Sequence, residues 1–351
     1  MKIAPIMQAM AEHERFEPVL VHTGQHYDEN LSRVFFDDLA IPHPDLNLEV
    51  GSGSRDEQIA NVRAAFAPVL ESQQPTAVLV VGDVNSTIAC ASVARENKCP
   101  VIHVEAGLRS FDSTMPEELN RVATDNISDF LFVTEESGMR NLQSEGVEGE
   151  RFLIGNVMID TLISNLERAR QSSVLSTLGV SEGNYMVATF HRPANVDTKD
   201  ALQRLLIMLR GITQRLPVVL PLHPRTKASM AEHGLIEQLR AIEGLHVVAP
   251  LGYLDFLALV SRSKGVVTDS GGIQEEATYL RIPCLTMRAN TERPITVELG
   301  SNELIGDNVD RLFAAVDEVQ SGTFKRGTVP DLWDGATAKR IIEQLAISLP
   351  G

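Results

Sequence analysis

Residues 266–276 read Val-Val-Thr-Asp-Ser-Gly-Gly-Ile-Gln-Glu-Glu, and this stretch indicates how the chain folds. Its apolar start is typical of a buried β-strand, the paired glycines allow a tight turn, and the residues that follow fit the beginning of a helix. Free backbone N–H groups at such a helix start, together with the helix dipole, favour an anion. We therefore expect a diphosphate to bind at Ser270 and Gly271, although an ordinary strand–helix turn capped by Ser270 has the same sequence pattern.

The same alternation of short apolar segments and longer amphipathic segments runs through the whole chain. Near-continuous apolar strands separated by helices indicate parallel sheets that are covered on both faces. The clearest predicted helices cover residues 58–72 and 200–214. The predicted strands cover residues 18–22, 77–81, 101–104, 130–133, 152–154, 186–189, 218–222, 245–248, 266–268 and 284–287.

The predicted strands fall into two groups, separated by the interval 155–184. A chain of 351 residues is long for one hydrophobic core and sufficient for two domains. The pattern predicts an α/β fold with two Rossmann-like doubly wound domains and a cleft between them. In such sheets ligands bind beyond the carboxyl ends of the strands, so the residues that follow each strand matter most.

The chain opens on a predicted helix, Lys2 to Glu14, whereas a doubly wound domain normally opens on a strand. We therefore expect that the first strand is absent from this chain or that the start codon is misassigned.

Bulk composition excludes several functions. A net charge of -16, with one Trp and four Tyr, argues against nucleic acid as a partner. Three scattered cysteines form no CxxC pair, which favours a reducing compartment over a disulfide or metal role. No apolar run is long enough for a membrane span, and no signal-peptide pattern is present. The composition predicts a soluble, cytoplasmic protein with no membrane or nucleic-acid partner.

Carboxylates follow the predicted strands of the first half. Asp83 follows the strand that ends at Val81, and Glu105 follows the strand that ends at Val104. Glu117 lies beside Pro116, which opens a helix. Each of these residues alone also fits a turn, a cap or an acidic residue at a helix start, with Glu117 pairing to Arg121. Their convergence beyond strand ends on one side of one sheet favours proton-transfer chemistry.

Basic residues follow two strands of the second half. His191 comes after the strand 186–189, and His223 with Arg225 comes after the next strand. A histidine at such a place can act as an acid, a base or a phosphate donor. Spacing does not separate three further histidines from structural roles, namely His22, His26 and His103. The sequence has no metal-binding spacing and no G-x-G-x-x-G before a helix, so we expect neither a metal nor a bound NAD cofactor.

Taken together, these segments resemble the non-hydrolysing UDP-N-acetylglucosamine 2-epimerases. The resemblance covers nearly the whole chain, in order and at compatible spacing. Its motifs are His22-Thr-Gly-Gln-His26, Gly82-Asp83 to Thr87, His103-Val-Glu-Ala-Gly-Leu-Arg109, Met115-Pro-Glu-Glu118 to Arg121, Gly155-Asn156, His191-Arg192, Thr268-Asp-Ser-Gly-Gly-Ile-Gln-Glu-Glu276 and Thr291-Glu-Arg-Pro294.

The resemblance implies a fold like that of the two-domain GT-B glycosyltransferases. Residues 1–158 would form the first domain, which a C-terminal helix over 336–349 would rejoin, and residues 159–335 would form the UDP-binding domain. It also implies a homodimer that takes a UDP-sugar and needs no cofactor, in polysaccharide biosynthesis. The implied reaction interconverts UDP-GlcNAc and UDP-ManNAc by eliminating UDP to leave a 2-acetamidoglucal and then adding UDP back.

The resemblance also assigns roles to single residues. Those implied as catalytic are Asp83, Glu105, Glu117 and His191, without deciding which one takes the C2 proton. Those implied as substrate-binding are Lys2, Phe256, Ser270, Gly271, Gly272, Glu276 and Arg293, with Phe256 against uracil and Glu276 on the ribose.

Two departures from the family pattern stand out. The family's first strand ends in Gly-Thr-Arg-Pro-Glu, whose Arg contacts the phosphate side of the ligand, and this sequence begins after that segment. Members that a second UDP-GlcNAc activates carry a Gln three residues after the one matching Gln25, where this chain has Asp28. We therefore expect weak or absent activation by a second substrate molecule.

Three alternatives stay open at this point. Relatives with a similar Gln-His-Tyr-Asp loop epimerise modified sugars such as UDP-2,3-diacetamido-glucuronate. A GT-B glycosyltransferase would use a sugar nucleotide as donor, but it would not need three carboxylates beside His191. A binding protein with an inactive site would show no turnover.

Overall fold

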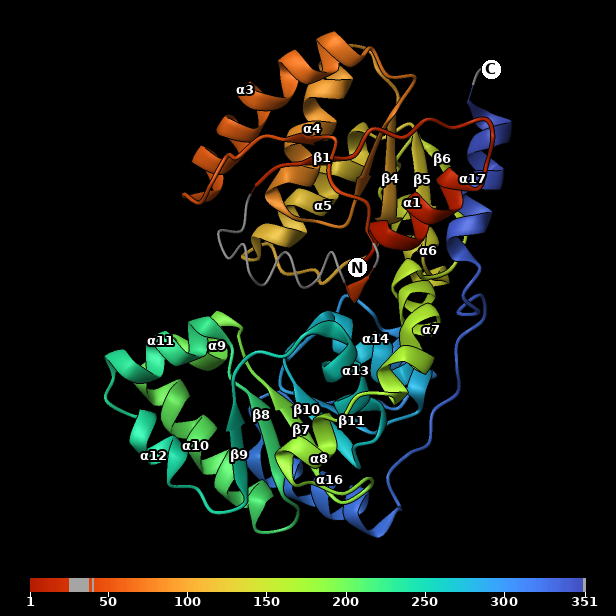
Figure 1. The fold of residues 1–351 in the computed structure, drawn as a ribbon. Helices are drawn as coiled ribbons and strands as arrows, with labels where there is room; N and C mark the ends of the chain where they lie inside the picture. The colour runs from red at the N-terminus through yellow and green to blue at the C-terminus, as the bar shows by residue number, and fades with distance from the viewer. Residues whose placement is uncertain (25–37, 40, 350–351) are drawn as a thin grey trace. The chain divides into compact units, whose positions relative to one another are not determined.

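The computed structural model describes residues 1–24, 38–39 and 41–349. The chain forms two compact units (Figure 1). Unit 1 comprises Met1–Ile163 and Asp331–Gly351, and unit 2 comprises Ser164–Pro330. The predicted class, α/β with parallel sheets, is confirmed, because every strand pair described in either unit is parallel.

Unit 2 contains a six-stranded sheet in the order β12-β11-β10-β7-β8-β9. The order reverses on either side of β7, so the sheet is doubly wound, and its switch point lies where β7 and β10 adjoin. The strands are β7 Met186–Thr189, β8 Val218–Pro221, β9 Leu245–Val248, β10 Gly265–Thr268, β11 Cys284–Thr286 and β12 Asn302–Leu304.

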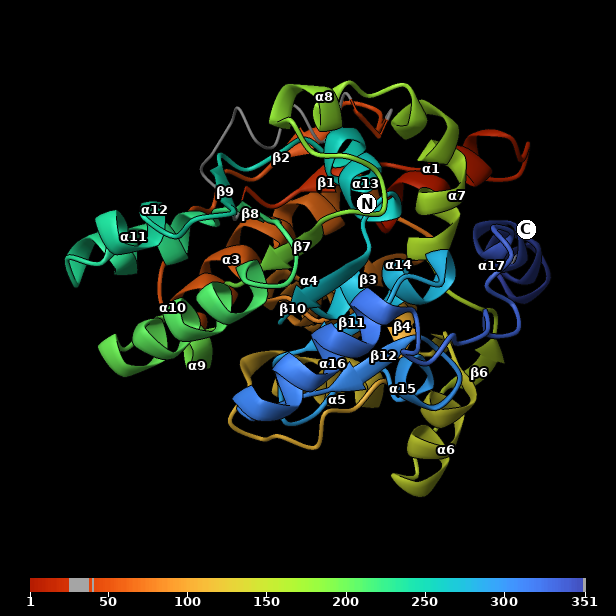
Figure 2. The ribbon, with the colours of Figure 1, turned by 90° about the horizontal axis from the view of Figure 1, so that it is seen from below.

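Helices cover both faces of this sheet, with α10 and α16 on one side and α13 and α14 on the other (Figure 2). The face under α10 and α16 buries a single apolar core that includes Met186, Ala188, Leu220 and Val267. The helices of unit 2 are α8 Val174–Leu178, α9 Pro193–Val196, α10 Lys199–Thr213, α11 Pro224–Glu232, α12 Ile236–Arg240, α13 Tyr253–Ser261, α14 Gly271–Leu280, α15 Ile295–Glu298 and α16 Val309–Ser321.

In unit 1 the strands form two parallel groups. One is a four-stranded sheet in chain order, β3-β4-β5-β6, and the other is the pair β1-β2. Strand β4 is buried along its whole length, including its two polar residues, His103 and Glu105. The strands are β1 Val21–His22, β2 Leu46–Asn47, β3 Val78–Val81, β4 Val101–Ala106, β5 Phe130–Val133 and β6 Glu150–Leu153.

The last helix of the chain belongs to unit 1. Helix α17 packs against α1 in an apolar cluster that includes Ile6, Ile341 and Leu345. Asp160 accepts the backbone N–H of Ala338 at 2.7 Å, which satisfies one of the free donors in the first turn of α17. The helices of unit 1 are α1 Ile3–Ala11, α3 Arg55–Gln73, α4 Asn85–Glu96, α5 Pro116–Ile127, α6 Glu136–Ser144, α7 Val157–Arg170, which runs into unit 2, and α17 Thr337–Ser348.

The predicted strands and helices agree closely with this structure. The strands 130–133, 186–189 and 245–248 are confirmed to the residue, and the helix predicted over 200–214 is α10. The opening helix is confirmed as α1. Strands β2 and β12 were not predicted, because one has two residues and the other, Asn-Glu-Leu, lacks an apolar run. None of the helices in the described ranges is long and apolar enough to cross a membrane.

Candidate active site

The first group of candidate residues lies at the carboxyl ends of β3 and β4 in unit 1. Glu105 is near the end of β4, where a bulge shifts the register against β5 between Val104 and Ala106. Its φ is +71°, a left-handed conformation that non-glycine residues rarely adopt. Only 2% of Glu105 is exposed. A buried carboxylate on a strained backbone is a feature that clusters at functional sites.

Glu105 has one paired and one unpaired carboxylate oxygen. Its Oε2 forms an ion pair with Lys2, which precedes α1. Its Oε1 is buried and has no hydrogen-bond partner among the described residues. Leaving a buried oxygen unpaired costs about 1–3 kcal/mol, so this atom is available to a ligand at little further cost.

Gly82 connects this pair to Asp83. A Cβ at Gly82 would lie 3.1 Å from Lys2 Nζ and 3.4 Å from Glu105 Oε2, and the φ of Gly82 is +74°. A side chain there would both crowd the pair and strain the turn. The structure therefore brings Lys2, Glu105 and the Asp83 loop together.

Asp83 is held by a buried arginine. Arg121 of α5 is only 2% exposed and forms an ion pair with Asp83. It also forms an ion pair with Glu118, at a distance of 2.5 Å. Glu118 also accepts the backbone N–H groups of Ser110 and Phe111, both at 2.9 Å. Arg121 thus fixes Asp83 to α5. The side chain of Asp83 remains partly accessible, with 21% of its surface exposed.

Glu117 differs from its neighbour. It is half-buried in the first turn of α5, and it does not form the ion pair with Arg121 that was one interpretation of the sequence. The pairing with Arg121 is wrong because Glu118, three residues before the arginine, faces it instead. Glu117 stays a candidate catalytic residue on α5, the helix that also carries Arg121.

The second group lies in unit 2, at the switch point of the sheet. His191 follows β7, and its Nδ1 lies 2.8 Å from Oδ1 of Asp269, which follows β10. Asp269 is fully buried and also accepts the backbone N–H of Arg192 at 2.9 Å and the side-chain amide of Asn195 at 3.1 Å. Burial alone would raise the pKa of Asp269, but the hydrogen bonds from His191, Asn195 and Arg192 hold it below its ordinary value.

His223 stands beside His191, with ring centroids 5.3 Å apart. Its Nδ1 accepts the backbone N–H of Arg225 at 3.1 Å, so the neutral ring carries its hydrogen on Nε2. Burial, and then the neighbouring His191, lower the pKa of His223 below its ordinary value. His191 therefore pairs with a carboxylate, whereas His223 is kept neutral.

A pocket of about 270 Å³ opens beside these histidines. Its lining includes His191, Phe256 of α13 and Ser270, so it joins three predicted site residues within one unit. An aromatic ring among apolar and proline side chains suits a planar base. The lining residues are Thr189, Phe190, His191, Pro221, His223, Pro250, Leu251, Phe256, Ser270 and Ile273.

Ser270 directly precedes α14, and Gly271 and Gly272 are the first two residues of this helix, which fits the predicted helix start. Ser270 is the N-cap residue, and its side chain makes no capping hydrogen bond. The guanidinium of Arg293 lies beside this turn, because a Cβ at Gly271 would be 3.0 Å from its Nη1. Arg293 is buried and pairs with Glu275 at 2.5 Å. Free helix N–H groups and a fixed cation at one place suit a diphosphate.

Glu276 lies one turn further along α14. It is 2% exposed and accepts the hydroxyl of Tyr253 at 3.1 Å. Burial raises the pKa of Glu276 to about 7, so the side chain is close to half-protonated at neutral pH. In that state it can accept or donate a hydrogen bond to a hydroxyl-rich ligand.

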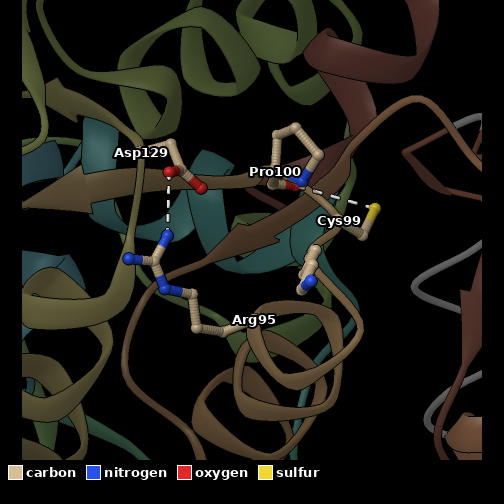
Figure 3. Close-up of a pocket in the computed structure, with 5 residues that line it drawn as sticks. Arg95, Cys99, Pro100 and Asp129 are labelled. Atoms are coloured by element: carbon tan, nitrogen blue, oxygen red, sulfur yellow. Dashed lines mark hydrogen bonds and ion pairs between the residues drawn. The ribbon is translucent and has the colours of Figure 1, made fainter.

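Another pocket, of about 210 Å³, lies away from these groups (Figure 3). Cys99, Pro100 and Asp129 line it just before β4 and β5, at the amino ends of the strands. Arg95 pairs with Asp129 across it at 3.0 Å. In open parallel sheets ligands bind at the opposite edge, so this pocket is not part of the candidate site.

Sequence reasoning placed the strand-end residues but missed some of their partners. Asp269 lies inside the quoted Thr-Asp-Ser-Gly-Gly motif, and its position directly after a strand was the signal that could have identified it. His223 was noted beside Arg225 but was not selected as a site residue. His26 and Asp28 lie outside the described residues. In the part of the chain that the structure describes, no three His, Cys, Asp or Glu side chains gather closely enough to hold a metal ion.

Comparison with known proteins shows which family this chain resembles. A family model described as UDP-N-acetylglucosamine 2-epimerase matches residues 8–346. The UDP-N-acetylglucosamine 2-epimerase of Methanocaldococcus jannaschii is 39% identical over 353 residues, which cover 98% of this chain and 95% of that protein. The UDP-2,3-diacetamido-2,3-dideoxy-D-glucuronate 2-epimerase of Pseudomonas aeruginosa is 38% identical over 353 residues, 98% of this chain and 96% of that protein.

Solved structures give the same result. The crystal structure of the M. jannaschii UDP-GlcNAc 2-epimerase in complex with UDP-GlcNAc and UDP superposes with a TM-score of 0.92 at 38% identity, covering 99% of this chain and 96% of that one. A sucrose-phosphate synthase of Thermosynechococcus elongatus, 12% identical with a TM-score of 0.59, shows a likeness of fold alone.

The fold and the family match define a sugar-nucleotide enzyme of GT-B-like architecture. The chain belongs to the UDP-N-acetylglucosamine 2-epimerase family.

Proposed function

We propose that this protein interconverts UDP-GlcNAc and UDP-ManNAc by inverting C2 of the sugar. The observation that carries the proposal is Glu105, a buried carboxylate with φ +71° whose Oε1 has no partner in the described part of the chain. Its other oxygen is neutralised by Lys2, and Asp83 follows the adjoining Gly82. Two carboxylates in unequal environments suit the removal and return of one proton.

The C2 proton is not acidic, because no carbonyl is conjugated to it. One carboxylate takes this proton while the C1–O bond breaks, and the electron pair of that bond leaves with UDP. The product is a 2-acetamidoglucal with a C1–C2 double bond. A proton then returns to C2 from the opposite face, and the β-phosphate oxygen adds back to C1. Asp83, Glu105 and Glu117 are the proposed acids and bases, with the residue that takes the proton left open.

Unit 2 is proposed to hold UDP. Phe256 and the apolar wall of the 270 Å³ pocket would contact the base, and Glu276 would contact the ribose. The start of α14, with Ser270, Gly271 and Gly272, would bind the diphosphate beside Arg293. His191, whose Nδ1 is held by Asp269, would present its Nε2 to the departing phosphate oxygen.

Further parts of the proposal follow from family membership. We infer that the two units act as the two predicted domains and that both contribute to one reaction. The first predicted domain comprises residues 1–158 and 336–349, and the second comprises residues 159–335. We infer also that the protein is a cytoplasmic homodimer that needs no cofactor and serves polysaccharide biosynthesis. We expect activation by a second substrate molecule to be weak or absent. A hyperbolic dependence of the rate on UDP-ManNAc concentration, measured without added UDP-GlcNAc, would support this expectation.

The second candidate substrate is UDP-2,3-diacetamido-glucuronate. It is favoured by the P. aeruginosa relative, whose 38% identity is close to the 39% of the M. jannaschii enzyme. Both substrates would undergo the same chemistry at C2, so the difference lies in groups that contact C3 and C6 of the sugar.

Incubation in D2O with each UDP-sugar, followed by proton NMR, tests both candidates. We expect UDP-ManNAc with deuterium at C2 from UDP-GlcNAc, and no product with an Asp83→Asn variant. Turnover of the diacetamido sugar alone would support the second candidate. Release of free sugar and UDP, or transfer to an acceptor without exchange at C2, would contradict an epimerase.

A further inference from the structure

His103, which sequence spacing could not classify, occupies a central place in unit 1. It lies on β4, two residues before Glu105, and is fully buried. Its Nδ1 is 2.7 Å from Oδ1 of Asp125, and its Nε2 is 2.8 Å from the carbonyl oxygen of Gly82. The ring therefore bridges α5, which carries Asp125, and the turn that leads to Asp83.

The partners of His103 determine its protons. A carbonyl oxygen only accepts, so Nε2 carries a hydrogen. Asp125 is fully buried, and burial alone would raise its pKa, but the charges and hydrogen bonds of His103 and Arg109 hold the pKa below its ordinary value. Asp125 faces Nδ1 and the Gly82 carbonyl faces Nε2, so both ring nitrogens of His103 have a partner.

Asp125 joins the same network to the end of β4. Its Oδ2 accepts Nη1 of Arg109 at 2.7 Å and the backbone N–H of Gly107 at 3.1 Å. Gly107 has a φ of +80°, and a Cβ there would lie 2.5 Å from the carbonyl oxygen of Gly138. The backbone after Glu105 is therefore fixed by Asp125, and the backbone before Asp83 is fixed by His103.

We propose that His103 is a positioning residue of the epimerase reaction. Resting on the function proposed above, this inference assigns to its Nε2–H the task of fixing the Gly82 carbonyl, and with it the side chain of Asp83 relative to Glu105. The ring is fully buried and bonded to Asp125 and Gly82, so it would act through these partners. A displacement of about 1 Å in a catalytic group can lower a rate about 10²-fold, so the bond to Gly82 matters for turnover and little for binding.

Two variants of similar size separate this role from a merely structural one. In His103→Gln the amide nitrogen stands near the place of Nε2 and can still donate to Gly82. In His103→Asn the amide nitrogen stands near the place of Nδ1 and can still donate to Asp125, but it cannot reach Gly82. The first variant keeps the proposed positioning bond, and the second keeps the contact with the buried carboxylate.

We would measure kcat and KM for UDP-GlcNAc, UDP affinity by calorimetry and the melting temperature for wild type and both variants. For His103→Asn we expect kcat to be about 10²-fold lower than in the wild type, with KM and UDP affinity within about twofold of the wild-type values. For His103→Gln we expect kcat within about tenfold of wild type. The positioning role would be overturned if both variants lost the same factor in kcat and this loss paralleled the decrease in melting temperature. It would also be overturned if kcat fell less in His103→Asn than in His103→Gln.

A crystal structure of His103→Asn gives a readout that does not depend on turnover. We expect the Gly82–Asp83 peptide to be displaced while Gly107 and Asp125 stay in place. An unmoved peptide would overturn the inference, even if the wild type proved inactive. An inactive wild type with a displaced peptide in the variant would instead contradict the proposed function alone.

Discussion

Nδ1 of His191 lies 2.8 Å from Oδ1 of Asp269, and the two residues follow the adjoining strands β7 and β10. Because Asp269 is ionised, Nδ1 is the donor, which leaves Nε2 as the ring nitrogen for a ligand in the pocket that His191 lines. Asp269 is also the residue before Ser270, so one carboxylate connects the histidine to the proposed diphosphate site. A doubly wound sheet places these residues together at its switch point.

Asp269→Asn should lower kcat through the orientation of His191. An amide can present its NH2 group to Nδ1, which would favour the tautomer with hydrogen on Nε2 and remove the negative charge. We expect kcat to fall at least about 10²-fold, and nitrogen NMR of the His191 ring should report the changed tautomer. Asp200→Asn, an exposed substitution in the first turn of α10, is the control and should leave both readings unchanged. An unaltered ring spectrum in Asp269→Asn would contradict this account.

Arg121→Met should destabilise unit 1. Arg121 is the ion-pair partner of both Asp83 and Glu118, and it is only 2% exposed. Removing one partner of a buried pair leaves charge uncompensated and typically costs about 3–5 kcal/mol. Urea unfolding would measure the loss. Arg140→Met, at an exposed position of α6, should change the free energy of unfolding by less than about 0.5 kcal/mol, and equal effects of the two substitutions would argue against a buried role for Arg121.

Gly271→Ala should weaken UDP binding without unfolding the protein. The added methyl group would lie 3.0 Å from Nη1 of Arg293, beside the helix N–H groups proposed to hold the diphosphate. Displacing Arg293 and covering these donors should raise the Kd for UDP about tenfold or more, which calorimetry can measure. Gly53→Ala in unit 1, where the nearest atom would be 3.4 Å away, is the matched control. Unchanged affinity in Gly271→Ala would place the diphosphate elsewhere.

Glu276→Gln should change how stability depends on pH. Burial raises the pKa of Glu276 from 4.5 to about 7. For a carboxyl group whose pKa is raised by folding, its contribution to stability is fully present below pH 4.5 and is lost as the pH rises through 7. A shift of this size corresponds to about 3 kcal/mol. We expect Glu276→Gln to flatten this part of the pH profile and to be more stable than wild type at pH 8, as judged by urea unfolding.

The control for this experiment is Glu232→Gln, an exposed substitution in α11 that should leave the profile unchanged. A wild-type profile that does not fall between pH 5 and pH 8 relative to Glu276→Gln would show that Glu276 titrates near its ordinary value.

The fold was predictable because its strands are nearly continuous apolar runs, such as Phe130–Val133 and Met186–Thr189. Asp83, Glu105 and His191 were predictable because residues directly after parallel strands share one edge of a sheet. The pairing of Arg121 with Glu118 was not predictable, since Glu117 and Glu118 are adjacent on a helix and only packing decides which one turns inward. The strained φ of Glu105 and the two-sided bonding of His103 likewise depend on tertiary contacts that no local pattern encodes.

The central claim is that the C1–O bond to UDP breaks during each inversion of C2. UDP-GlcNAc carrying ¹⁸O in the bridge between C1 and the β-phosphorus tests it most directly. Once the bond breaks, the released β-phosphate can rotate, and phosphorus NMR of the recovered UDP-sugar should show the label in non-bridging positions, at a rate that Asp83→Asn abolishes. Formation of UDP-ManNAc with all of the label still in the bridge would contradict elimination and return of UDP.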